Sequence, residues 1–339
     1  MMINQILNIK YPVFQGAMAH IATPEFAAAV SNAGGLGIIA TGGMHADEAR
    51  TAILKAQQLT DRPFGVNLML MNPETPELVK VITELKPAVV TTGAGNPGPY
   101  IKQLKEAGIR IFPVVASVAL AKRLARSGVD GIIAEGTESG GHVGETTTMA
   151  LLPQVVKAVD IPVIAAGGIA GGDSFLAALA MGAAGVQVGT CLLVSEECPV
   201  HPAYKEAVLK AKDTSTTVTG RSLGSPVRIL KNSMSREYLR LEQEGADQME
   251  MEKLTLGSLG KAVRDGDVRD GSVMMGQAAG ELQEIRPLAQ ILEDMIAGAR
   301  SSCSRLNEQM SLLINDEAAG QETVKSETGD NSAGDTIKE

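Results

Sequence analysis

Eight short runs of apolar, largely β-branched residues recur along the first 190 residues, separated by amphipathic stretches with helical spacing. They cover residues 12–15, 36–39, 64–67, 88–91, 111–115, 131–134, 162–165 and 185–188. Strands that alternate with helices form βαβ units and hence a parallel sheet. Runs that are apolar on both faces suit a sheet that helices cover. Eight such units predict an α/β fold, a closed (β/α)8 TIM barrel spanning residues 1–200.

The regular alternation stops after the eighth run. Residues 201–270 contain helical patches and a charged segment rich in Glu and Met, without clear strands, which predicts a small, mostly helical insertion over the barrel mouth. Residues 271–313 are expected to return to the barrel and supply its closing helix. That helix would bury an apolar face with a period near 3.6 residues: Ile285, Leu288, Ile291, Leu292, Met295 and Ile296. Residues 314–339 hold mainly small, polar and acidic residues, which predicts a disordered acidic tail.

Composition and charge exclude several classes of protein. No apolar run reaches the ~20 residues that a membrane helix needs, so no membrane association is expected. Of the net charge of −9, −5 lies in the last 24 residues, and the mild remainder gives no indication of nucleic-acid binding. Three cysteines without a CxxC pair do not form a disulfide framework, which favours a reducing cytoplasm.

Residues 201–240 have a net charge of +5, although the chain as a whole is negatively charged. Their basic residues are Lys205, Lys210, Lys212, Arg221, Arg228, Lys231, Arg236 and Arg240, against the acids Glu206, Asp213 and Glu237. One interpretation is a solvated surface with a local excess of charge. The other is a docking patch for an acidic partner.

Glycines gather where the strand pattern places the carboxyl ends of the strands, which is where TIM barrels carry their active sites. The loops after strands seven and eight often bind phosphate in this fold, and here they read AAGGI (165–169) and QVGT (187–190). Backbone N–H groups and a Thr hydroxyl suit a phosphate monoester. The alternative is that these glycines only permit tight turns.

Residues 93–98 (GAGNPG) match the GxGxxG pattern after a strand. A Rossmann dinucleotide site would need an acidic residue ~20 positions further on, and residues 113–118 (PVVASV) contain none. The match therefore does not indicate a dinucleotide fold.

His142 lies in a glycine-rich segment, EGTESGGHVG (135–144), after the sixth strand. A lone His is usually a core residue, but the flanking glycines leave little for it to pack against. A side chain with a pKa near neutrality can deliver a proton at working pH, which makes His142 the candidate catalytic residue. His20, His45 and His201 are scattered and show no metal-ligand spacing, so no metal is expected.

Several segments together resemble the FMN-dependent enoyl-acyl carrier protein reductase II family, the FabK type, within the nitronate monooxygenase superfamily. They are YPVFQGAMA (11–19), AGGLGII (33–39), FGVN (64–67), VTTGAGNP (90–97), AEG (134–136), GGHVG (140–144), AAGGI (165–169) and VQVGT (186–190). HP (201–202), RILKN (228–232) and GSVMMGQ (271–277) add to the resemblance. It spans about residues 3–310 and leaves the acidic tail outside.

The resemblance implies an FMN enzyme on a TIM barrel that uses NADH or NADPH to reduce the double bond of an enoyl thioester on acyl carrier protein, the last step of fatty acid elongation. It implies that His142 protonates or polarises the substrate. The residues around the flavin ring and ribityl chain would be Gly16, Ala17, Met18, Asn67, Glu135 and Gly141. The phosphate end would lie on Gly167, Gly168, Gln187, Gly189 and Thr190, and Met275 and Gly276 would belong to a segment that closes over the cofactor. A homodimer is the expected assembly.

Two other functions remain open at this point. Nitronate monooxygenases share the fold and the flavin, but the members to which we compare this chain carry Ala-Pro-Met and Gly-Gly-His-Arg where it has Gly16-Ala17-Met18 and Val143. His20 stands where many reductases carry an aromatic residue. A ligand-sensing barrel without redox chemistry is the third possibility, and His142 argues against it.

Overall fold

The computed structural model describes the backbone of residues 1–326 and the side chains of residues 1–313, apart from that of residue 248. It contains an eight-stranded parallel sheet in the order β1-β9-β8-β6-β5-β4-β3-β2. The strands are β1 (Val13–Gln15), β2 (Gly37–Ala40), β3 (Phe64–Met69), β4 (Val89–Gly93), β5 (Arg110–Val115), β6 (Ile132–Glu135), β8 (Val163–Ala166) and β9 (Gly185–Val188). Each coincides with a predicted strand to within about two residues.

The two ends of the sheet meet and close it into a barrel. Phe14 forms a parallel bridge with Leu36. The Leu36 amide donates to the Val13 carbonyl at 2.8 Å, and the Gln15 amide donates to the Leu36 carbonyl at 2.9 Å. The predicted (β/α)8 TIM barrel is therefore confirmed.

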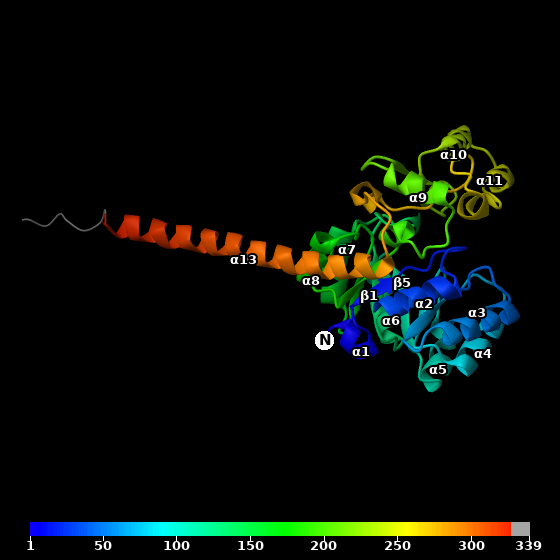
Figure 1. Cartoon of the computed structure of the whole chain (residues 1–339), viewed down its shortest axis with the longest axis horizontal. Coiled ribbons are helices and arrows are strands. Elements are labelled where there is room, and N and C mark those ends of the chain that lie inside the picture. The colour runs from blue at the N-terminus through cyan, green and yellow to red at the C-terminus, as the bar shows by residue number, and fades with distance from the viewer. Residues whose placement is uncertain (327–339) are drawn as a thin grey trace, which may run out of the picture.

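Seven helices connect the strands and cover the barrel (Figure 1). They are α2 (Pro24–Ala33), α3 (Ala46–Leu59), α4 (Thr75–Leu85), α5 (Gly98–Glu106), α6 (Val118–Arg126), α7 (Thr148–Ala158) and α8 (Gly172–Ala180). In α2, the Thr23 hydroxyl caps the Phe26 amide and Pro24 occupies the first turn, as the sequence indicates. A short N-terminal helix, α1 (Ile3–Leu7), packs against one end of the barrel through Ile3, whose amide donates to the Ala184 carbonyl.

The barrel interior is a packed core. Phe14 and Phe112 meet edge to face, with ring centroids 5.6 Å apart, and neither ring is exposed. Leu36, Ile38 and Ile164 fill the space around them. The interior therefore leaves the loops at the carboxyl ends of the strands as the place for a ligand.

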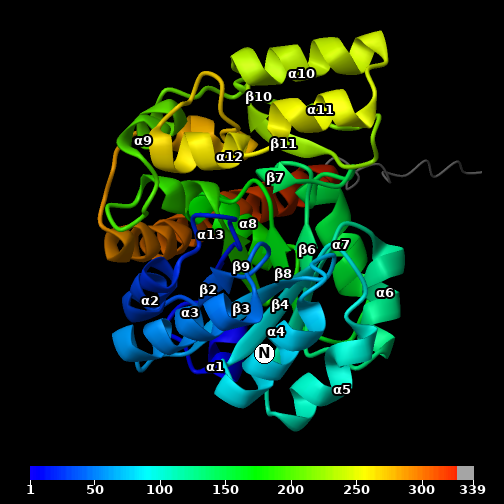
Figure 2. The ribbon, with the colours of Figure 1, turned by 90° about the vertical axis from the view of Figure 1, so that its right-hand side faces the viewer.

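A separate layer lies over the carboxyl ends of the strands (Figure 2). It contains the 3-10 helix η1 (Thr190–Val194), α9 (Pro202–Leu209), α10 (Ser233–Glu244), α11 (Gln248–Thr255), α12 (Ser258–Gly260), the π-helical turn η2 (Lys261–Asp265) and the 3-10 helix η3 (Gln277–Glu281). It also contains strands that the sequence pattern did not indicate. β10 (Thr216–Thr219) and β11 (Val227–Leu230) form an antiparallel sheet with β7 (Gly141–His142), a two-residue strand from the barrel. The expectation of an insertion without clear strands was wrong.

The last described element is a long helix, α13 (Leu288–Ser326), which lies along α8 and then projects beyond the barrel (Figure 1). Leu288, Leu292 and Met295 are buried as predicted, whereas Ile285 precedes the helix and is 42% exposed. The helix continues through residues 314–326, where the sequence predicts disorder. Extending a helix that packing has already started needs no further apolar burial. Residues 327–339 of the predicted tail lie outside the described residues.

No helix of residues 1–326 is both long enough and apolar enough to cross a membrane.

The α8–α13 contact depends on close backbone approach, which leads to a stability prediction. A Cβ at Gly172 would lie 2.4 Å from the Ala299 amide nitrogen and 2.4 Å from the Gly298 carbonyl carbon. We expect Gly172→Ala to lower the free energy of unfolding by about 1–3 kcal/mol, because the two helices must separate. Thermal and urea denaturation measure the change.

Gly171→Ser is the matched control, since a Cβ at Gly171 meets nothing within 4 Å and Ser is favoured at an N-cap. Equal stability of the two variants would contradict the close-packing argument.

Candidate functional site

The carboxyl ends of the strands bring the predicted site residues to one end of the barrel. They follow β1 (Gly16, Ala17, Met18), lie in β3 (Asn67), flank the β6–β7 loop (Glu135, Gly141, His142), follow β8 (Gly167, Gly168), and lie in or after β9 (Gln187, Gly189, Thr190). Met275 and Gly276 come from the segment that returns from the insertion. The contact of these residues with a cofactor remains a prediction.

The strand register aligns Glu135 with Gln187 across three neighbouring strands near the barrel mouth. Glu135 pairs with Ala166 across β6 and β8, and Ala166 pairs with Gln187 across β8 and β9. Gln187 is buried but makes no hydrogen bond through its side chain to another described residue. On β3, the Asn67 amide donates to Thr91 Oγ1 at 3.0 Å. Polar side chains therefore line the strand ends at this level.

The loops after β8 and β9 form an open cradle. Gly167 and Gly168 both have positive φ, at 95° and 72°, a conformation that other residues rarely adopt. At Gly189, a Cβ would meet only Met18 Sδ within 4 Å, at 3.6 Å. The backbone of Gly189 is thus accessible to a ligand, and Met18 borders the same space.

The return segment packs onto the cradle. The Gly276 amide donates to Thr190 Oγ1 at 2.9 Å, and the Gln277 amide donates to the Glu138 carbonyl at 2.9 Å. A Cβ at Gly140 would lie 2.8 Å from the Met275 Cα, so loop and return segment are in close contact. The Met275 side chain itself is buried in the main core. The segment covers the cradle mainly through its backbone.

Two buried hydroxyls lie at this site, on Thr137 and Ser139. Neither makes a hydrogen bond of good geometry to a described residue, although the Ser139 hydroxyl lies close enough to the Glu135 carboxyl to affect its pKa. Buried hydroxyls normally have a hydrogen-bond partner, so their freedom leaves donors and acceptors for a ligand or water. Together with the open cradle at Gly189, they fit a bound polar cofactor such as FMN.

Glu135 ends β6 beside this loop. Burial raises the pKa of its carboxyl to about 7, and the nearby Ser139 hydroxyl only partly opposes the rise. Desolvation disfavours the charged form of an acid. Glu135 is therefore poised between its neutral and charged forms near neutral pH.

His142 lies on β7 at the other end of the loop and is exposed. The protein atoms around it still lower its pKa, by desolvation. At neutral pH the imidazole is therefore mainly neutral, with one N–H donor and one nitrogen acceptor. His142 can hold or pass one proton without carrying a permanent charge.

The β6–β7 loop is held by groups that the sequence pattern did not single out. The Glu138 carboxylate accepts hydrogen bonds from the amide and the hydroxyl of Thr148, each at 2.9 Å. Thr148 Oγ1 also lies 2.9 Å from the Gly167 carbonyl, which connects this loop to the cradle. From the insertion, Arg228 Nε donates to the Thr137 carbonyl at 2.9 Å. A Glu in a loop and an Arg in a basic stretch carry no local signal of such contacts.

The other histidines lie elsewhere or are used differently. His45 and His201 precede α3 and α9 as N-cap residues, and His201 Nδ1 accepts from the Ala203 amide. His20 is exposed and has positive φ, at 62°, in the loop between β1 and α2. None of the described residues forms a cluster of three His, Cys, Asp or Glu side chains that could hold a metal ion.

The basic stretch 201–240 is much less basic at the surface than its sequence indicates. Lys205 and Arg228 are buried, so counting Arg228 as a surface charge was wrong. Three further bases are paired with acids: Lys210 with Glu206, Arg221 with Glu145, and Arg240 with Glu237 and Glu244. Lys212, Lys231 and Arg236 stay exposed and have no acidic partner among the described side chains.

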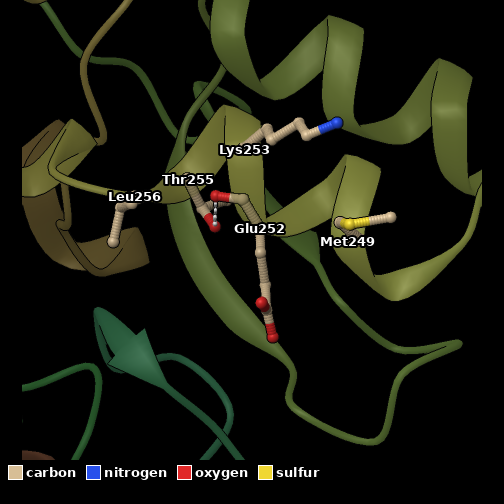
Figure 3. Close-up of a pocket in the computed structure, with 5 residues that line it drawn as sticks. All are labelled: Met249, Glu252, Lys253, Thr255 and Leu256. Carbon is tan, nitrogen blue, oxygen red and sulfur yellow. Dashed lines mark hydrogen bonds between the residues drawn. The ribbon is translucent and has the colours of Figure 1, made fainter.

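Two cavities have no predicted site residue in their lining. The one in Figure 3 has a volume of about 260 Å³ and is lined by Met249, Glu252, Lys253, Thr255 and Leu256. The other, of about 290 Å³, is lined in part by Gly171, Cys191 and Arg286. Neither is lined by a predicted site residue, and the geometry at the barrel mouth therefore defines the candidate site.

Comparison with solved structures gives a strong match over nearly the whole chain. The fold superposes on FabK from Thermotoga maritima with a TM-score of 0.88 and 48% sequence identity, covering 91% of this chain and 98% of that one. This confirms the resemblance to the FabK type.

Sequence comparison identifies the wider family. A probable nitronate monooxygenase from Staphylococcus saprophyticus is 32% identical over 88% of this chain and 98% of its own length. A 5-hydroxy-7a-methyl-1-oxo-octahydro-1H-indene-4-carboxyl-CoA dehydrogenase from Rhodococcus jostii is 38% identical over 232 residues, 68% of this chain and 66% of that protein. The family model for nitronate monooxygenase matches residues 1–84 and 75–298. The chain therefore belongs to the nitronate monooxygenase family of FMN-dependent oxidoreductases.

Proposed function

We propose that this protein is an FMN-dependent enoyl-acyl carrier protein reductase that uses NADH or NADPH. The observation that carries the proposal is the 48% identity to FabK over nearly the full length of both chains. The Rhodococcus relative, a carboxyl-CoA dehydrogenase, supports thioester chemistry in general. Nitronate monooxygenase is the second candidate, because the family model and the staphylococcal relative carry that name.

In this proposal the cradle holds FMN by its phosphate. The amides at Gly167, Gly168 and Gly189 would approach the phosphate oxygens, and Gln187 would reach the polar edge of the cofactor. None of the residues predicted to bind the phosphate is Lys or Arg, so phosphate binding would depend on oriented backbone amide dipoles. When bound, FMN supplies the redox step, passing two electrons from the nicotinamide to the β-carbon of the substrate.

Side chains of the protein would supply the proton that the substrate takes up after hydride addition. Hydride addition to an enoyl thioester places negative charge on the α-carbon and carbonyl oxygen, which a nearby donor stabilises. His142, mainly neutral, would donate its N–H to that oxygen or deliver its proton to the α-carbon. Glu135, with a pKa of about 7, would keep the opposite end of the loop free of full negative charge.

The substrate partner is proposed to be acyl carrier protein, an acidic protein. Lys212 and Lys231 support a docking site because both are exposed and both backbones bond to Ser215. Their amides donate at 2.8 Å each, to the Ser215 hydroxyl and carbonyl respectively. This pair replaces the wider basic stretch as the candidate contact.

His142→Ala tests the reaction. We expect a yellow protein that NADH or NADPH still bleaches under anaerobic conditions, while re-oxidation by crotonyl thioester slows by ~10²–10⁴, because only this step needs the proton donor. Stopped-flow spectroscopy separates the two half-reactions. Unchanged re-oxidation would exclude His142 as the donor, and a wild-type enzyme that oxidises alkyl nitronates but ignores enoyl thioesters would favour nitronate monooxygenase.

Gly189→Glu tests the cradle. A carboxylate at this position would repel the FMN phosphate and block the approach to the amides, so we expect a folded protein that purifies without colour. Gly43→Glu is the control, since Gly43 follows β2 and a Cβ there meets nothing within 4 Å. Full FMN content in Gly189→Glu, measured by absorbance after denaturation, would refute the phosphate assignment.

Reversing the two lysines tests the partner. Lys212→Glu/Lys231→Glu should raise KM for enoyl-acyl carrier protein several-fold and leave KM for a small enoyl thioester unchanged, because only the protein substrate is steered by charge. The difference should shrink in ~0.5 M salt. Lys55→Glu/Lys122→Glu, on helices α3 and α6, is the charge-matched control. Equal effects of the two double variants would leave the lysine pair without a specific role.

A further inference from the structure

The guanidinium of Arg228 is buried behind the loop that carries His142. Arg228 is 7% exposed and lies in β11, where its Cα pairs with that of Gly141. Its Nε donates to the Thr137 carbonyl at 2.9 Å, and its Nη1 donates to Thr216 Oγ1 at 3.0 Å. One side chain thus joins two strands of the insertion to the barrel loop between Glu135 and His142.

Glu138 holds the same loop from the opposite side. Its carboxylate accepts from the amide of Thr148 at 2.9 Å, and Thr148 begins α7 of the barrel. Burial lowers the pKa of Arg228, and the charge of Glu138 only partly opposes this effect, although no direct ion pair joins the two side chains. The peptide from residue 137 to residue 138 is therefore held between a cation on the insertion and an anion fixed to the barrel.

The backbone of His142 is held by the same pairing between β7 and β11. Its Cα pairs with that of Val227, and the Val143 amide donates to the Pro226 carbonyl at 3.1 Å. Gly141, with φ of 79°, and Gly140 precede it, so the loop itself restrains His142 weakly. The restraint has to come from the insertion.

We propose that Arg228 is a positioning residue, which fixes His142 over the candidate site by holding the Thr137 carbonyl and the β7–β11 pairing together. This inference rests on the proposed function, in which His142 provides a proton. It assigns to the insertion the task of orienting a barrel side chain, in addition to covering the barrel mouth.

A purely structural role for Arg228 would be to dock the insertion onto the barrel. Other contacts already hold the insertion. Lys205 Nζ donates to the Ser195 carbonyl at 2.6 Å, and Arg221 forms an ion pair with Glu145 of the barrel. Within the insertion, Asn232 Nδ2 donates to the carbonyls of Val268 and Gly271 at 2.9 and 2.7 Å. Loss of Arg228 should therefore loosen the loop while the insertion keeps its fold.

The test compares Arg228→Met, which keeps the length and apolar stem of the side chain, with Arg228→Lys and with the control Arg236→Met. Arg236 is exposed on α10 of the same insertion. The first readout is the titration of His142 by NMR in the FMN-loaded protein, assigned among the four histidines with His142→Ala. The second is the rate of each half-reaction.

We expect Arg228→Met to raise the pKa of His142 toward its ordinary value, because a looser loop admits water. Loss of a nearby positive charge would also raise this pKa, and Arg228→Lys, which keeps the charge, separates that cause from loosening of the loop. Re-oxidation by enoyl thioester should fall ~10- to 100-fold, in line with small misplacements of catalytic groups, while reduction by the nicotinamide is retained. Arg228→Lys, which keeps the charge but not both hydrogen bonds, should lie between Arg228→Met and the wild type.

An unchanged titration of His142 in Arg228→Met, with or without a lower Tm, would overturn the proposal. A change of the same size in Arg236→Met would also overturn it. Should the wild-type protein reduce no enoyl thioester, the proposed function fails, and the titration still decides whether Arg228 positions His142.

Discussion

Closure of the barrel between β1 and β2 is the constraint on which the site depends. The sheet closes through two hydrogen bonds, from Leu36 to Val13 and from Gln15 to Leu36, and through the packing of Phe14 inside the barrel. The parallel direction of the eight strands places all their carboxyl ends on one side, and closure arranges these ends in a ring. Residues separated by more than 170 positions, such as Gly16 and the Val188 carbonyl that its amide contacts at 2.7 Å, then share one wall. No local sequence motif builds this wall, and only the closed topology does.

The glycines that allow close backbone approach at the site also make the β6–β7 loop flexible, and contacts from the insertion restrain that loop. Gly140 and Gly141 let the β6–β7 loop pass close to the Met275 backbone, but a loop of this kind has many accessible conformations. Pairing of β7 with β11 and the hydrogen bond from Arg228 to Thr137 remove that freedom. The barrel supplies the position of the site, and the insertion supplies its rigidity.

The sequence predicted the barrel well because each strand is an apolar run bounded by turn residues, and those signals are local. It did not predict β7 or its partners, since a two-residue strand such as Gly141–His142 has no pattern of its own and forms only when β11 lies beside it. Because the sequence pattern did not indicate β11 either, Arg228 was counted as a surface charge, although the fold buries its side chain against the Thr137 carbonyl. The sequence predicts disorder for residues 314–326 because they contain few large apolar residues, whereas a helix that continues from a packed segment needs only helix-compatible residues.

Desolvation shifts the pKa values of the two ionisable groups of the site in opposite directions, and each shift favours the neutral form. It raises the pKa of Glu135 to about 7 and lowers that of His142, so near neutral pH the two groups carry less charge than they would in water. The full charges of Glu138 and Arg228 lie behind the loop, where hydrogen bonds to Thr148 and Thr137 satisfy them. An uncharged ring system and a thioester both suit such a space, because neither has to give up the solvation of a full charge on entering. A charge that develops during the reaction would then meet few competing charges, which makes a single oriented N–H from His142 more effective than it would be in water.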